Sequence, residues 1–273
     1  MNQYNIKNKK LDVKEFQHPA DKRAVDAVTA IPGFEKIVDF ISKNSIERVY
    51  SFMNNSSRLK ITDKMSPKMS AMISEAAEMF NSERIPDIYI ERSYIMRIVL
   101  EGVKNPFVIF STSILEQISD EMLWPVMVSE IAGIQAKHAV IKFIDSLLGF
   151  GGGLLPFGAD IALGYAISDW YRNKAYTYDR AILLASENFE LTAKHILFGE
   201  ASGDVLESLK LADPDSSYLE QANEFLRRKG ADGAVQKLNT VFSKNQWAAS
   251  RYMELYNWYH TGNYHDIIER SEG

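Results

Sequence analysis

The sequence predicts an α+β protein that is mostly helical and contains one small antiparallel sheet. Three observations lead to this fold class. Apolar residues recur at helical spacing through most of the chain, the β-rich stretches lie together between residues 85 and 111, and proline or glycine marks the ends of most segments.

The part of the chain before residue 85 is expected to be helical. The pattern DKRAVDAVTA, residues 21–30, stops at Ile31-Pro32-Gly33, which is a strong stop signal. Residues 34–55 carry their apolar side chains at helical spacing. Ser66-Pro67 then begins another helix, because a proline in the first turn lacks only an N–H that would be unpaired there anyway.

Three stretches rich in β-branched and aromatic residues follow: IPDIYIER (85–92), YIMRIVLE (94–101) and PFVIFS (106–111). We expect two or three antiparallel strands, joined around EGVKN. Ser113-x-x-Glu116 resembles a capping box for a short helix, and Ser119 can cap the next helix. Residues 161–189 contain no proline and one glycine, so they predict one long helix.

The composition narrows the function classes. The 273 residues are 46% apolar and 25% charged, as in ordinary globular proteins, and the net charge of −5 argues against nucleic acid as the main partner. The absence of cysteine excludes disulfides, thiolate zinc sites and cysteine nucleophiles. The polar N-terminus shows no signal peptide, so a cytoplasmic location is expected.

One apolar region, residues 140–167, raises the question of membrane contact. Lys142, Asp145 and Asp160 interrupt it, and GFGGGLLPFG lies in its middle. No uninterrupted run reaches the roughly 18 to 20 residues that a membrane span needs. The pattern favours a buried helical hairpin with a glycine-rich bend, with a hairpin that touches a membrane as the alternative.

The stretch VMVSEIAGIQAKH, residues 126–138, is similar to the helix of a zinc peptidase without its ligands. In a His-Glu-x-x-His motif the two histidines lie on one face of a helix and bind one zinc ion, and the glutamate activates the zinc-bound water. Here the two histidine positions are Ser129 and Gly133, and the glutamate is Glu130. His138 lies eight residues beyond Glu130, about 12 Å along the helix, so the two cannot share an ion on one straight helix.

Five pieces in order resemble the HtpX and CAAX-prenyl-endopeptidase family of zinc metallopeptidases, most closely its soluble bacterial members. They are HPADKRAVDAVTAIPGF, IPDIYI, PFVIFSTSILEQISDE, VMVSEIAGIQAKH and WYRNKAYTYDRAILL. The resemblance implies a zincin-like (gluzincin) peptidase fold with a motif helix and a second long helix. It also implies a helical N-terminal part (1–84), a peptidase-like core (85–200) and a helical C-terminal part (201–273), together forming one compact unit.

The resemblance places the family's zinc ligands on Ser129, Gly133 and Ala175, none of which binds zinc well. It places the general base on Glu130, which is then vestigial, and the companion aspartate of the later motif on Asp179. Arg172 also matches, and a pairing of Arg172 with Glu130 or Asp179 is one hypothesis for what fills the space of the zinc ion. The family's Asn-Ala-Phe signature is not recognisable in residues 95–99.

The resulting expectation is a catalytically inactive metallopeptidase homologue, a pseudopeptidase, that binds no zinc and no other cofactor. Its expected partner is a peptide or protein, held by strand addition between Tyr94 and Phe110. Whether the chain is an enzyme stays open. The alternatives are an active metalloendopeptidase with a divergent metal site, and a peripheral membrane protein that uses the hairpin at 140–167.

Overall fold

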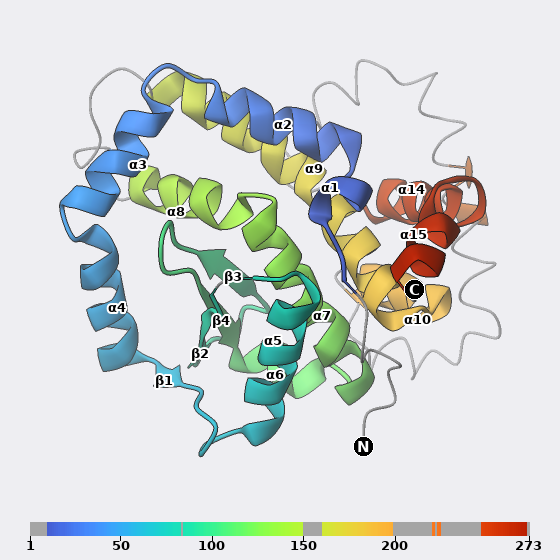
Figure 1. Ribbon diagram of the computed structural model, residues 1–273, viewed down its shortest axis with the longest axis horizontal. Coiled ribbons are helices and arrows are strands. Elements are labelled where there is room, and N and C mark those ends of the chain that lie inside the picture. The colour runs from blue at the N-terminus through green and yellow to red at the C-terminus, as the bar shows by residue number, and fades with distance from the viewer. Residues whose placement is uncertain are drawn as a thin grey trace.

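The computed structural model describes residues 10–82, 84–149, 160–198, 220–221, 223–224 and 247–271. These residues are mostly helical and include one small sheet, which confirms the coarse fold class (Figure 1). The helices are α1 (Val13–Phe16), α2 (Pro19–Thr29), α3 (Phe34–Lys43), α4 (Ile46–Ser57), α5 (Pro67–Met79), α6 (Thr112–Gln117), α7 (Asp120–Gln135), α8 (His138–Gly149), α9 (Asp160–Ser186), α10 (Phe189–Phe198), α14 (Ala248–Thr261) and α15 (Tyr264–Ser271). The strands are β1 (Leu59–Lys60), β2 (Asp87–Glu91), β3 (Ile98–Glu101) and β4 (Phe107–Ser111).

Local capping explains where several helices begin. The Ser66 and Ser119 side chains accept backbone N–H groups at the starts of α5 and α7, as the sequence predicts. The expected cap of α6 was wrong by two residues. Ser111 caps this helix by accepting the N–H of Ile114, whereas the Ser113 hydroxyl donates to the carbonyl of Ser93.

The sheet is mixed rather than antiparallel, with the strand order β1-β2-β4-β3. The expected hairpin of β3 and β4 is present, but β4 also pairs with β2 in parallel. The reason is that the segment between β2 and β3 crosses to the far edge of the sheet, so β4 lies between these two strands and pairs with both. Arg97 and Ser93 of that segment hydrogen-bond to Ser111 and Thr112 at the end of β4, which fixes the crossover.

The two largest groups of buried apolar side chains among the described residues form most of the core. One joins the sheet to α5, α7 and α9, and the other joins α2 and α3 to α8 and the first half of α9. The second group contains Ile141, Ile144, Leu163 and Ile167, so the described arms of the expected hairpin are buried together. The expected bend GFGGG begins at Gly149. Its other residues, 150–153, lie outside the described residues. Across the described residues, no helix is long and apolar enough to cross a membrane.

Candidate functional site

The site is built on two helices that pack along each other, α7 and α9, with α2 lying on the far part of α9 (Figure 1). Helix α7 is buried continuously from Met122 to Gly133 because apolar side chains cover all of its faces. Its two neighbouring motif positions, Ser129 and Glu130, are 3% and 8% exposed. Helix α9 carries Ala175 and Asp179, so the two expected motif segments lie on neighbouring helices.

The first expected ligand position is satisfied within its own helix. The hydroxyl of Ser129 donates to the backbone carbonyl of Val126 at 2.7 Å. This bond satisfies the buried donor, as buried hydroxyl groups require. Ser129 therefore acts as a helical side chain turned back on the preceding turn rather than as a group presented to a ligand.

The second expected ligand position is filled by a side chain from α9. A β-carbon on Gly133 would lie 2.5 Å from the hydroxyl oxygen of Tyr178 and 2.8 Å from Cδ2 of Leu100. No real β-carbon tolerates such contacts, so Tyr178 and Leu100 occupy the space that a side chain on α7 would need. A histidine does not fit at this position without moving both neighbours.

The third position, Ala175, has no donor atom in its side chain, but the residue before it brings a positive charge to the site. The Nζ atom of Lys174 lies 5.0 Å from the ring centre of Trp170, 4.9 Å from that of Tyr171 and 5.9 Å from that of Tyr178. An ammonium group over aromatic rings is attracted by their negative faces.

Glu130 and Lys174 form an electrostatic pair in this site. Burial raises the pKa of Glu130 to about 7, and the nearby ammonium of Lys174 limits that rise. Burial lowers the pKa of Lys174 to about 8, and the carboxylate of Glu130 limits that fall. The charges are not joined by a direct ion pair or hydrogen bond between described residues. The two charges therefore act on each other through space within the buried site.

The hypothesis that Arg172 pairs with Glu130 or Asp179 was wrong. Asp179 receives two hydrogen bonds from Arg251 of α14, at 2.6 and 2.9 Å, and is 1% exposed. Arg172 instead pairs with Asp169 on its own helix at 3.1 Å. Seven residues span about 10 Å along a helix, so Arg172 and Asp179 share a face but are two turns apart.

His138, the candidate for an alternative ligand, belongs to a separate buried pair. Its Nε2 atom lies 3.0 Å from both carboxylate oxygens of Asp21, which also accepts the hydroxyl of Thr177 at 2.6 Å. These contacts lock α2 and α8 onto α9. His138 is therefore engaged in holding the helices together. Another histidine near this part of the fold, His195 of α10, is also desolvated, and burial lowers its pKa to about 4.

The residues present do not fit a zinc ion at the motif positions. Serine, glycine and alanine supply no suitable set of donors, and Tyr178 fills the space of one of them. The described part of the chain contains no group of three or more His, Asp or Glu side chains that could hold a metal ion.

Sequence reasoning missed three residues of this arrangement: Lys174, Tyr178 and Arg251. The sequence KAYTY, residues 174–178, could have indicated Lys174 and Tyr178, because residues four apart share one face of a helix. Arg251 is 72 residues from its partner Asp179 in sequence, and no local pattern indicates that contact.

Comparison with known proteins relates the chain broadly to metallopeptidases. It is 24% identical to the plastoglobule-localized metallopeptidase 48, chloroplastic, of Arabidopsis thaliana, over 273 residues that span 96% of this chain and 77% of that protein. No family model and no solved structure matches the chain.

Proposed function

We propose that this protein is a catalytically inactive metallopeptidase homologue, of the HtpX and CAAX-prenyl-endopeptidase type, that binds an extended segment of a peptide or protein. The observation that carries the proposal is the filled space at Gly133, where the hydroxyl of Tyr178 stands in the place of a ligand side chain. Together with Ser129 and Ala175, it leaves the two packed helices α7 and α9 without the donors that zinc needs at the expected ligand positions.

The binding half of the proposal rests on the edge of the sheet. In the described sheet β3 is an edge strand, paired only with β4. The backbone carbonyl of Arg97 accepts the N–H of Ser111. Along an antiparallel ladder, every second residue of a strand bonds to its neighbour in this way. The N–H and carbonyl groups of Ile98 and Leu100 therefore point away from β4, where an added strand would pair with them.

The segment before β3 adds apolar surface to this edge. Tyr94 and Ile95 are 91% and 68% exposed, and Met96 is 36% exposed. At the other end of β3, the hydroxyl of Ser146 on α8 donates to the carboxylate of Glu101 at 2.5 Å, so α8 covers that end. The accessible part of the edge is thus the stretch from Tyr94 to Val99.

The first experiment measures the zinc, cobalt and nickel content of the purified protein by elemental mass spectrometry. The proposal expects less than about a tenth of an ion per chain, because three donors are missing where a structural or catalytic zinc site needs three or four. About one tightly held ion per chain would overturn it and would favour the alternative of an active enzyme with a divergent metal site.

The second experiment tests peptide binding at the edge of β3. A library of unstructured peptides is screened for binding, and hydrogen exchange then locates the bound peptide. We expect slower exchange of the Ile98 amide on binding and loss of binding in Ile98→Pro, which removes the outward N–H but leaves the bonds to β4. Ile98→Val keeps that N–H and is the matched control. Equal binding by the two variants, or cleavage of the peptide, would contradict the proposal.

A further inference from the structure

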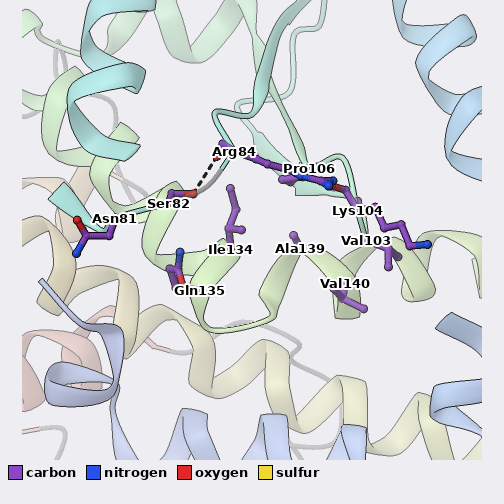
Figure 2. A pocket seen from close by; sticks show the side chains of 11 residues that line it. Asn81, Ser82, Arg84, Val103, Lys104, Pro106, Ile134, Gln135, Ala139 and Val140 are labelled. Carbon is purple, nitrogen blue, oxygen red and sulfur yellow. Dashed lines mark hydrogen bonds between the residues drawn. The ribbon is translucent and has the colours of Figure 1, made fainter. Parts of the chain in front are cut away.

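A cavity lies away from the motif positions, where α7 ends and α8 begins; we name it the α7–α8 pocket (Figure 2). Its volume is about 380 Å³, within the range of small-molecule sites. Ile134 and Ala139 rise into it from the helices, and Arg84 extends above them toward Lys104 and Pro106 (Figure 2). The pocket thus has an apolar floor below a basic rim.

The charge of the rim is positive and uncompensated within the pocket. Arg84 and Lys104 are both exposed, and neither forms an ion pair with any residue in the described ranges. Arg84 donates instead to the backbone carbonyl of Lys104, which holds its guanidinium against the turn. No carboxylate is found among the described residues that line the pocket. A negative group at the rim would meet these two cations, and the carboxylate of Glu47 is engaged by backbone N–H groups of the turn behind the rim.

The backbone N–H groups of the turn between β3 and β4 are not available to a phosphate. The N–H groups of Val103, Lys104 and Asn105 all point at one carboxylate oxygen of Glu47, at 2.6, 2.9 and 3.3 Å. Successive backbone N–H groups of this kind are the usual donors for a phosphate. Because Glu47 already occupies them, the pocket offers one planar guanidinium and one ammonium, a set that suits a carboxylate.

We propose that the α7–α8 pocket binds a small amphipathic carboxylate, with the carboxylate at Arg84 and Lys104 and the apolar body over Ile134 and Ala139. Two molecules offer this chemistry: a free medium-chain fatty acid, and the C-terminal residue of a polypeptide with an apolar side chain. Both place one negative charge at the end of an apolar body, so they bind by the same contacts.

The test is a titration of the ¹⁵N-labelled full chain with octanoate, followed by the backbone amide signals. We expect saturable shifts at Ala139 and Val140 with a Kd of roughly 0.1 to several mM, in keeping with the affinity that so few atoms can supply. Octanamide, which lacks the charge, should bind at least about tenfold more weakly, because charge-assisted hydrogen bonds are lost. N-acetyl-glycyl-leucine and its amide form the second arm, and tighter binding of that acid than of octanoate identifies a polypeptide C-terminus as the source.

The variant Arg84→Gln/Lys104→Gln should weaken octanoate binding at least about tenfold, since both substitutions remove an exposed cation from the rim. Lys64→Gln, which removes an exposed cation outside the pocket, is the matched control and should bind as the parent chain does. Equal affinity for octanoate and octanamide, an unchanged affinity of the double variant, or shifts spread away from α8 would each overturn the proposal. None of these results depends on zinc content or on binding at the edge of β3.

Discussion

Replacing Glu130 with glutamine should stabilise the fold at pH 8 and should change its stability much less at pH 5. Glu130 is 8% exposed, and burial raises the pKa of its carboxyl group from 4.5 to about 7. Below pH 4.5 the carboxyl group is protonated in both the folded and the unfolded chain. As the pH rises from 4.5 to 7, the unfolded chain loses this proton first, so the folded state loses stability over that window.

The magnitude follows from the pKa of about 7 in the fold and the ordinary value of 4.5. At pH 8 the shift corresponds to about 3 kcal/mol, and at pH 5 to less than about 1 kcal/mol. Glutamine has nearly the shape of the protonated glutamate and carries no charge. We therefore expect Glu130→Gln to raise the free energy of unfolding by about 2 to 3 kcal/mol at pH 8, as an upper estimate.

Urea unfolding of both proteins at pH 5 and pH 8 measures this difference. Glu116→Gln removes an exposed carboxylate from the neighbouring helix α6 and is the matched control. Equal or lower stability of Glu130→Gln at pH 8 would refute the reasoning, as would an equal difference at both pH values. Lys174→Met should shift the wild-type pH dependence upward, because Glu130 then lacks the cation that limits its pKa.

Three further predictions concern the surroundings of the site. Arg251→Met should destabilise the fold by about 3 to 5 kcal/mol by leaving a buried carboxylate unpaired, whereas Arg172→Met should cost less than about 1 kcal/mol in the same thermal or urea melts. Gly133→Ala should lower the free energy of unfolding by about 1 to 3 kcal/mol, because the added methyl group collides with the Tyr178 hydroxyl. The double variant Gly133→Ala/Tyr178→Phe should recover part of that stability. Equal losses with and without the hydroxyl would show that the contact is not the cause. The pKa of about 4 keeps the His195 imidazole neutral in the fold, so the folded state loses stability as the pH falls from 6.5 toward 4. Between pH 8 and pH 5 the free energy of unfolding of the wild type should fall by about 2 kcal/mol more than that of His195→Gln. Parallel pH profiles of the two proteins would contradict this.

The helices could be predicted from the sequence because their signals are local. Ser66-Pro67, Ser119 and the long uninterrupted stretch after residue 160 identify α5, α7 and α9 through caps and spacing. These signals involve residues a few positions apart, so one chain is enough to interpret them.

The sheet topology could not be predicted in the same way, because strand order depends on contacts between distant residues. One cue was present in the run Phe107–Phe110. All four side chains are buried, as expected of a strand covered on both faces rather than of a half-exposed antiparallel strand. The run favoured a central position for β4, and the sheet is mixed because β4 occupies that position between β2 and β3.

The two segments that carry the motif positions form packed helices, but the residues around them could not be anticipated from the motif alone. Tyr178 and Lys174 have ordinary helical spacing, and their role arises only because α9 packs along α7. The wrong pairing of Arg172 has the same origin. A shared helical face indicates direction, whereas an ion pair also requires that the two groups lie within about one turn.

The residues around the motif positions fit the side chains that are present there. Ser129 bonds to its own helix, and Tyr178 fills the space beside Gly133, so a histidine at position 133 would require its neighbours to change as well. Glu130 and Lys174 differ, because both are held in surroundings that disfavour their charges. Packing alone would favour uncharged side chains there. Each of these two groups limits the pKa shift of the other, so the stability of the buried pair depends on pH, as the predictions for Glu130→Gln and Lys174→Met require.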